Sequence, residues 1–301
     1  MTIVIAGGTG FLGSRLTASL RSDGHRVLLL TRRPRASNDV AWDPADPMGV
    51  WTSTLEDADA VVNLAGESIE AGRWTAARKA AILGSRATAT RAIVSAIAKA
   101  DRRPGVLLSA SAIGFYGPRG TEQLGEDAPA GSDFLASVCL EWEARARESR
   151  ATRVVLLRTG LVLDARGGAL PKLARPFRLF AGGPVGSGRQ YWSWIHADDW
   201  VRLVRWAIDT ADVSGPVNLT APNPVTNSVF AQTLGQVLNR PAWLPAPAFA
   251  LRLLLGEMAD ALVLGGQRVL PAAAQARGFE FRYPELRPAL QAIYGRPEPE
   301  R

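Results

Sequence analysis

Residues 7–13 have the sequence GGTGFLG (Gly7, Gly8, Thr9, Gly10, Phe11, Leu12 and Gly13) and decide the fold of this chain. They follow the apolar segment 2–6 and lead into residues 14–20, whose apolar side chains recur at helical spacing. A strand, a glycine turn and a helix in this order open a dinucleotide-binding α/β fold. The glycines let the backbone approach a pyrophosphate, which the amides at the start of the helix would bind. A purely structural glycine turn is the alternative, and the flanking strand and helix favour the nucleotide.

The composition is that of a globular protein. The chain has 301 residues, of which 47% are hydrophobic and 21% are charged, enough for one large or two smaller domains with a sizeable core. Cys139 is the single cysteine, so no intrachain disulfide can form and a reducing compartment, the cytoplasm, is expected. The most apolar later stretch, 244–266, contains Arg252, Glu257 and Asp260. It predicts an amphipathic helix, and no membrane association is expected.

The formal net charge of +7 raises the question of nucleic-acid binding. Lysine occurs only at Lys79, Lys99 and Lys172, and the arginines are scattered along the chain. No compact basic run is interleaved with aromatic residues, so no nucleic acid is expected among the partners. One cysteine and two histidines do not supply the ligand spacing of a zinc site, so no metal is expected.

Apolar β-type segments alternate with helical patterns through the first half of the chain, which predicts parallel βαβ units. The expected strands are 25–31, 59–66, 105–111 and 153–163, and the expected helices are 76–100 and 134–149. From about residue 167 the alternation gives way to loops rich in glycine and proline and to helices rich in alanine, leucine and arginine.

The end of the second predicted strand bears on the choice of cofactor. An acidic residue there would bind the ribose 2′-hydroxyl of NAD, whereas arginine favours the 2′-phosphate of NADP. Arg32 and Arg33 stand at this position, and the first carboxylate after them is Asp39. Because the arginine fork binds phosphate in bidentate fashion, the expected cofactor is NADP(H). A solvated basic loop is the alternative.

Six motifs together resemble the short-chain dehydrogenase/reductase superfamily. They are GGTGFLG (7–13), NLAGESI (63–69), RWTAARKAAILGSR (73–86), SASAIGFYG (109–117), FLASVCLEWE (134–143) and YWSWIHADD (191–199). In combination they are similar to an atypical branch of the extended, NAD-dependent epimerase/dehydratase-like members, called epimerase family proteins, which carry a distinct C-terminal segment. The resemblance covers essentially the whole chain.

This resemblance implies an α/β fold, a Rossmann-type doubly wound parallel sheet with a smaller C-terminal substrate domain. The NADP-binding domain would span residues 1–166, with a later strand returning from about 191–220, and the substrate domain most of 167–301. Residues 64–66 are similar to the N-A-G motif whose backbone lies under the adenosine half of the cofactor. The expected cofactor-binding residues are Gly7, Thr9, Gly10, Phe11, Leu12, Gly13, Arg32, Arg33, Leu64, Ala65, Gly66 and Ser109.

Residues 109–117 resemble the S-S-x-x-V-Y-G loop that borders the nicotinamide and the substrate. In the family, a serine four positions before the tyrosine hydrogen-bonds the reacting oxygen. Here that position is Ala112, and the nearest hydroxyl is that of Ser111. The resemblance therefore makes Ser111 the candidate donor to a carbonyl oxygen.

The superfamily's general acid/base is a tyrosine whose pKa is lowered by a lysine four residues later. This chain contains no Y-x-x-x-K, and the aligned helix has Leu135 and Cys139 at the two positions. Tyr116 is the remaining candidate proton donor. Without a lysine it would be a poor base at neutral pH, so reduction is favoured over oxidation.

Three further residues are candidates for substrate binding. Arg86 stands where the extended family commonly has an asparagine, and either binds an anionic group or is solvated. His196 lies in a stretch similar to R-x-F-I-H-V-D-D, and bracing of the substrate loop is favoured over titration. Glu67 follows the NLAG segment and either lines the pocket or belongs to a solvated helix start.

The expected function is that of an NADP(H)-binding, epimerase-like oxidoreductase acting on a small hydroxyl- or carbonyl-bearing metabolite. The missing tyrosine and lysine motivate the alternative, a catalytically weak or inactive NADP(H)-binding regulatory protein that reports redox state to a protein partner. Some members of the branch carry a label that connects them with cell division. A homodimer is a further arrangement consistent with either function.

Overall fold

The computed structural model of the chain describes residues 1–46 and 49–295. The described chain forms two compact units, and neither is a single stretch of sequence. The first unit comprises Met1–Phe115, Ser137–Arg158 and Val201–Val217; the second comprises Tyr116–Ala136, Thr159–Trp200 and the described part of Asn218–Arg301. The domain boundary expected near residue 166 stays a prediction.

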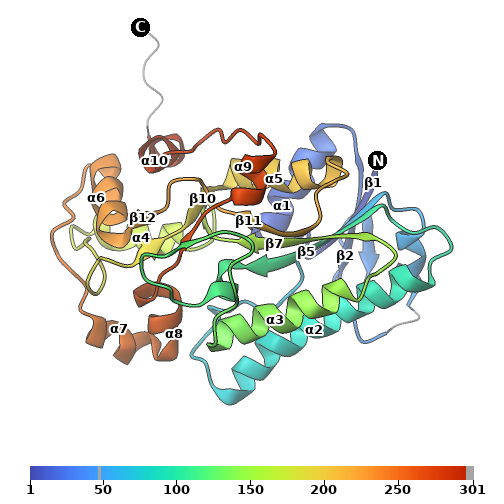
Figure 1. The fold of residues 1–301 in the computed structure, drawn as a ribbon, viewed down its shortest axis with the longest axis horizontal. Helices are drawn as coiled ribbons and strands as arrows, with labels where there is room; N and C mark the ends of the chain where they lie inside the picture. Colours follow the sequence, from blue (N-terminus) through green and yellow to red (C-terminus); the bar gives the residue numbers. More distant parts are fainter. Residues whose placement is uncertain (47–48, 296–301) are drawn as a thin grey trace, which may run out of the picture. The chain divides into compact units, whose positions relative to one another are not determined.

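A seven-stranded sheet is the centre of the first unit (Figure 1). In order across the sheet, its strands are β3 (Asp39–Ala41), β2 (Arg26–Thr31), β1 (Thr2–Ala6), β4 (Ala60–Asn63), β5 (Val106–Ala112), β7 (Arg153–Thr159) and β11 (Gly215–Leu219). The neighbouring strands from β3 to β5 are parallel. Ile3, Val4 and Ile5 are fully buried, as expected for a strand that is covered on both faces of the sheet.

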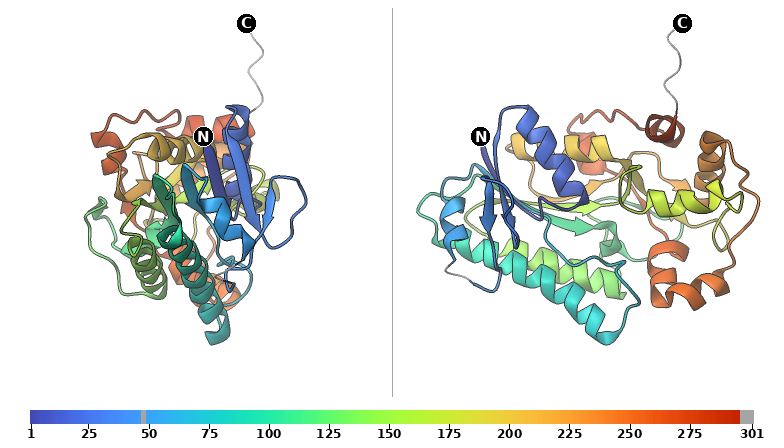
Figure 2. Two further views of the ribbon diagram at one scale, coloured as in Figure 1. Left: turned by 90° about the vertical axis from the view of Figure 1, so that its right-hand side faces the viewer. Right: turned by 180° about the vertical axis from the view of Figure 1, so that it is seen from behind.

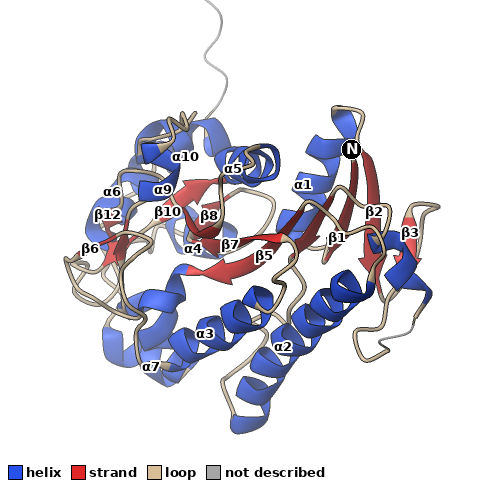
Figure 3. Cartoon of the chain, turned by 45° about the vertical axis from the view of Figure 1, so that its right-hand side comes forward, coloured by secondary structure: helices blue, strands red, loops and turns tan. Residues whose placement is uncertain are grey.

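Helices cover both faces of this sheet (Figures 2 and 3). On one face lie α2 (Ala76–Lys99) and α3 (Phe134–Arg147), and on the other lies α1 (Phe11–Ser22). The chain leaves β1 for one face and β4 for the other, so the strand order reverses between β1 and β4. This arrangement confirms the predicted Rossmann-type doubly wound sheet, and it places a ligand-binding crevice at the carboxyl ends of these two strands.

Two features of its sequence stabilise α2: a capping residue before its first turn and an apolar face toward the sheet. The hydroxyl of Thr75, the residue before the helix, accepts a hydrogen bond from the Arg78 amide. This is the N-cap arrangement that satisfies a free amide of the first turn. Ile93 and Ile97 on the buried face belong to one hydrophobic cluster with strand residues such as Val61. A cap and an apolar stripe together hold α2 against the sheet.

Two sequence predictions about element length were wrong. The strand expected over 153–163 is divided into β7 and β8 (Leu161–Leu163) at Gly160, where a Cβ would lie 2.6 Å from the Ser193 carbonyl oxygen. The helix expected over 244–266 is divided into α7 (Ala248–Leu255) and α8 (Glu257–Ala259) at Gly256, whose φ is +63°. With a ψ of −141°, this backbone conformation is open essentially to glycine alone, and it ends α7.

The second unit is built from short strands and helices. Its strand pairs are β8 with β10 (Trp194–His196), β9 (Tyr191–Trp192) with β12 (Val225–Thr226), and β6 (Gln123–Leu124) with β13 (Arg268–Val269). Its remaining helices are α4 (Leu170–Arg178), α6 (Asn227–Leu238), α9 (Ala272–Ala276) and α10 (Leu286–Tyr294), while α5 (Ala197–Asp209) contributes residues to both units. Trp194, Phe230 and Leu290 are in its apolar core. Among the described residues, no helix has the length and apolar character needed to span a membrane.

Candidate nucleotide-binding site

The glycine turn between β1 and α1 needs its glycines for two different reasons. Gly7 has φ of +79°, and a Cβ there would lie 2.8 Å from the carbonyl carbon of Leu64. Gly13 is buried against the turn, and a Cβ there would lie 2.3 Å from the Gly7 carbonyl oxygen. Gly10 precedes α1, and no described side chain caps the helix. The amides of its first turn are therefore available to an anion at the carboxyl end of β1.

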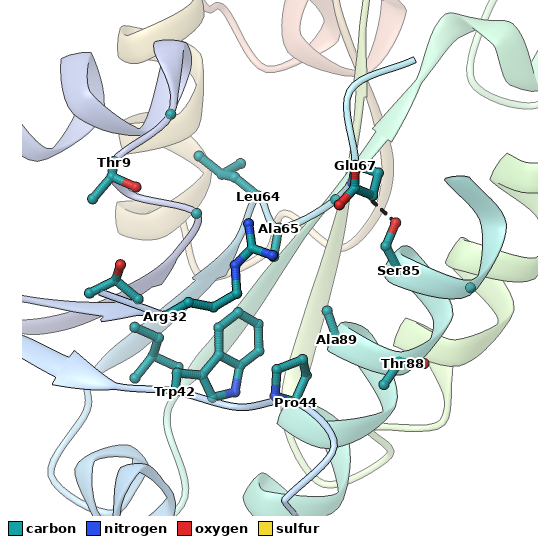
Figure 4. A pocket seen from close by; sticks show the side chains of 16 residues that line it. Thr9, Arg32, Trp42, Pro44, Leu64, Ala65, Glu67, Ser85, Thr88 and Ala89 are labelled. Atoms are coloured by element: carbon teal, nitrogen blue, oxygen red, sulfur yellow. Dashed lines mark hydrogen bonds between the residues drawn. The ribbon is translucent and has the colours of Figure 1, made fainter. Parts of the chain in front are cut away.

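A pocket of about 530 Å³ lies at the carboxyl ends of β1, β2 and β4 (Figure 4). Residues from all three strand ends and from α2 line it: Gly7, Thr9, Gly10, Leu30, Thr31, Arg32, Trp42, Pro44, Leu64, Ala65, Gly66, Glu67, Gly84, Ser85, Thr88 and Ala89. Seven of the predicted cofactor-binding residues and the predicted substrate residue Glu67 thus meet in one place. Five others do not line it: Phe11, Leu12 and Gly13 are within α1, Ser109 is within β5, and Arg33 follows β2.

A second cavity of about 570 Å³ has Thr9, Thr31 and Arg32 in common with this pocket and is strongly cationic. It is lined by Thr9, Thr31, Arg32, Arg33 and Arg35. The nearest carboxylate in the sequence, that of Asp39, accepts hydrogen bonds from the Arg35 and Ala36 amides at 2.8 and 3.1 Å. Asp39 therefore closes the turn after β2, and three arginines surround a space suited to a phosphate.

Trp42 and Pro44 are among the lining residues that were not predicted from the sequence. Trp42 follows the three-residue strand β3 and is 7% exposed, with its ring edge-on to Trp51 at 6.0 Å. Figure 4 shows Trp42 and Pro44 beside Arg32 on one wall of the pocket. The Nε1 atom of Trp42 is buried and has no hydrogen-bond partner among the described residues. An aromatic wall next to an arginine cluster suits a nucleobase next to a phosphate.

The segment that follows β4 is held in place by α2. The Glu67 amide donates to Ser85 Oγ at 3.0 Å, and Arg86 Nη1 donates to the carbonyl oxygens of Glu67 and Ile82, each at 3.0 Å. The Arg86 guanidinium also lies 4.9 Å from the Trp142 ring centre, and burial lowers its pKa. Arg86 therefore positions the backbone after β4, and its binding of an anionic ligand stays a prediction.

Ser111 belongs to a buried ionic network. Its hydroxyl donates to Glu143 Oε1 at 2.8 Å, and both side chains are at most 4% exposed. The two Glu143 oxygens also accept from Arg158 at 2.8 and 2.9 Å and from Arg147 at 3.3 Å. This network was not predicted from the sequence. Glu143 looks like an ordinary helix-surface acid in the sequence, but an arginine within the apolar strand β7 was a signal of a buried partner.

The helix position aligned with the family's lysine supplies no charge. Cys139 is buried, its Sγ atom lies 3.7 Å from the Ala112 carbonyl oxygen, and burial raises its pKa to about 11. The thiol is therefore neutral at physiological pH. Ser109, two residues before Ser111 on β5, is fully buried, and its hydroxyl has no hydrogen-bond partner among the described residues.

Tyr116 and His196 are both in the second unit. The fully buried Tyr116 donates its phenolic hydrogen to Asn218 Oδ1 at 2.7 Å. The His196 ring lies against Tyr283 at 4.0 Å, and its Nδ1 atom accepts from the Asp198 amide at 3.1 Å. These contacts support the loop-bracing role for His196. Within residues 1–46 and 49–295, no group of three or more His, Cys, Asp or Glu residues is arranged to hold a metal ion.

Comparisons with known proteins agree with this geometry. The model of the NAD dependent epimerase/dehydratase family matches residues 3–219, and a model of a domain of unknown function (DUF1731) matches residues 246–293. The chain is 45% identical to the chloroplastic "Epimerase family protein SDR39U1 homolog" of Arabidopsis thaliana, over 97% of this chain and 86% of that protein. It is 41% identical to the "Epimerase family protein YfhF" of Bacillus subtilis, over 97% and 98%.

A solved structure is similar over the same extent. The crystal structure of human epimerase family protein SDR39U1 (isoform 2) with NADPH has a TM-score of 0.90 and 37% identity to this chain. The match covers 98% of this chain and 99% of the human one.

Proposed function

Because the chain belongs to the NAD dependent epimerase/dehydratase family, we propose that it binds NADP(H) in the pocket at the carboxyl ends of β1, β2 and β4. The observation that carries this proposal is the cluster of Arg32, Arg33 and Arg35 in a cavity whose lining contains no carboxylate. A 2′-phosphate would be attracted there, whereas the ribose 2′-hydroxyl of NAD would find no acidic partner. The human relative described above was crystallised with NADPH, which supports the same cofactor.

The residues of the pocket fit the NADP(H) cofactor. A side chain at Gly7 or Gly13 would collide with backbone, so the turn stays open to a pyrophosphate that the first amides of α1 would hold. Trp42 would flank the adenine, and Arg32 and Arg33 would hold the 2′-phosphate. When bound, the nicotinamide supplies hydride exchange.

We further propose that the chain is an oxidoreductase acting on a small metabolite with a hydroxyl or carbonyl group. Ser111, at the end of β5, is the proposed hydrogen-bond partner of the reacting oxygen. Tyr116 is the weaker candidate for proton transfer, because its phenolic hydrogen is already bonded to Asn218. Reduction remains favoured over oxidation, since the sequence contains no Tyr-x-x-x-Lys pair to supply the family's lysine-activated base.

A second function is favoured by the same absence of acid/base groups. In this alternative, the chain binds NADP(H) without turnover and reports redox state to a protein partner or to a second copy of itself. Phe249, Leu253 and Leu254 of α7 are 73, 76 and 69% exposed, an apolar surface that suits such a contact. The single cysteine continues to favour a reducing compartment, and the cytoplasm is the compartment that we propose.

The two functions are separated by one assay on the purified protein. The oxidation of NADPH is followed by the loss of NADPH absorbance in the presence of a panel of small aldehydes, ketones and keto sugars. The rates of the wild type and of Ser111→Ala are compared. Turnover that falls in the variant supports the oxidoreductase. NADPH binding without turnover across the panel supports the regulatory alternative, and its test is whether partner capture changes between NADPH-bound and nucleotide-free protein.

A further inference from the structure

Arg32 and Glu67 lie on opposite sides of the glycine turn. Arg32 follows β2 and Glu67 follows β4, and these two strands flank β1 on its two edges. Strands in a sheet are about 4.8 Å apart, so the two strand ends are separated by roughly 10 Å. Both side chains line the same pocket. The pocket thus has a cationic end beside β2 and a carboxylate beside β4.

A dinucleotide has one ribose on each side of its pyrophosphate. In the proposed function, the pyrophosphate lies at the start of α1 and the 2′-phosphorylated ribose lies at Arg32, so the second ribose extends toward β4. A ribose diol donates hydrogen bonds, and a carboxylate is the side chain that best accepts them, as at the adenosine ribose of NAD-binding folds.

From this arrangement we infer that Glu67 binds the hydroxyls of the nicotinamide-side ribose, so that it is a cofactor-binding residue. The inference rests on the proposed function. It replaces the earlier expectation that Glu67 contacts the substrate.

Neighbouring residues hold the backbone and the carboxylate of Glu67 in place. Its amide is bonded to Ser85 and its carbonyl oxygen to Arg86, so the backbone is fixed from α2. Its Oε2 atom is 3.2 Å from Arg78 Nη1, and Arg78 also donates to the Ser68 carbonyl oxygen. The side chain is 42% exposed, and a carboxylate can accept about four hydrogen bonds. Arg78 therefore orients the group and offsets its charge, leaving capacity for two hydroxyls.

The test compares two ligands that share only the adenosine side. NADPH contains both riboses, whereas 2′,5′-ADP contains the adenine, the 2′-phosphorylated ribose and one 5′-phosphate but no nicotinamide-side ribose. Dissociation constants for both are measured by calorimetry with wild type, Glu67→Ala and Glu67→Gln. Glu70→Ala, in the same loop but not in the pocket lining, is the matched control. Circular dichroism checks that each variant is folded.

The inference predicts that Glu67→Ala weakens NADPH binding by about tenfold or more, the effect of losing hydrogen bonds to a charged group. Affinity for 2′,5′-ADP should stay the same or rise, because removing a negative charge favours any anionic ligand. Glu67→Gln should fall between Glu67→Ala and wild type, and Glu70→Ala should match wild type.

Three results would overturn the inference. Unchanged NADPH affinity in Glu67→Ala means that the carboxylate does not hold the cofactor. Equal weakening of both ligands means that the residue acts only on the structure of the pocket. If wild type binds neither ligand, the proposed function fails as well, and this outcome is distinguishable because 2′,5′-ADP binding tests the adenosine side alone.

Discussion

Ser111 donates its hydroxyl hydrogen to Glu143 across 2.8 Å, and this bond decides what Ser111 can offer to a ligand. Arg158 and Arg147 also donate to the Glu143 carboxylate, so its oxygens are the acceptors of this network. Ser111 therefore presents lone pairs, and in this arrangement it accepts hydrogen bonds. To donate to a carbonyl oxygen, the role proposed for it in a reduction, Ser111 would have to turn its hydrogen away from Glu143.

Replacing Glu143 with glutamine should destabilise the protein strongly. The change leaves Arg158, which is 2% exposed, without its bidentate carboxylate, and breaking a buried pair costs about 3–5 kcal/mol. The free energy of unfolding, measured by urea denaturation, should fall by this amount. Glu141→Gln on the same helix is the control, because its pair with Arg145 is solvent-exposed and should contribute little to stability. Similar losses in the two variants would contradict a buried network.

The pH dependence of stability should contain a contribution from Cys139. Burial raises its pKa from 9.0 to about 11, so the folded protein favours the neutral thiol. The resulting stabilisation is complete below pH 9 and is lost as the pH rises from 9 to 11; two pKa units correspond to about 3 kcal/mol. Cys139→Ala should therefore lose less stability than wild type over this interval. Parallel curves for the two proteins would show that the thiol does not titrate differently on folding.

Two glycine substitutions should change stability in opposite directions. Gly13→Ala places a methyl group 2.3 Å from the Gly7 carbonyl oxygen, which should cost about 1–3 kcal/mol and abolish nucleotide binding. Gly84→Ala places it in open space within α2, where alanine is favoured over glycine by about 1 kcal/mol. Urea denaturation of both variants checks the signs. A Gly13→Ala variant with normal stability would contradict the close packing of the turn on α1.

The parts of the fold that were predictable are those with local patterns. The glycine turn and the alternation of apolar strands with helices lead directly to the doubly wound sheet, because each feature is written within a few residues. Trp42 was missed because β3 has only three residues and no periodicity. The burial of Glu143 was missed because its partners, Ser111 and Arg158, are on β5 and β7, and a contact between distant segments leaves no local signal.

Fluorescence titration with NADPH and NADH measures whether the arginine cluster makes the nucleotide site selective for NADP(H). Wild type should bind NADPH more tightly than NADH, and Arg32→Ala should weaken NADPH binding by about tenfold or more while leaving NADH binding nearly unchanged. Arg91→Ala, an exposed change on α2 away from the pocket lining, should match wild type. Equal affinity of wild type for the two nucleotides, unaffected by Arg32→Ala, would contradict the account.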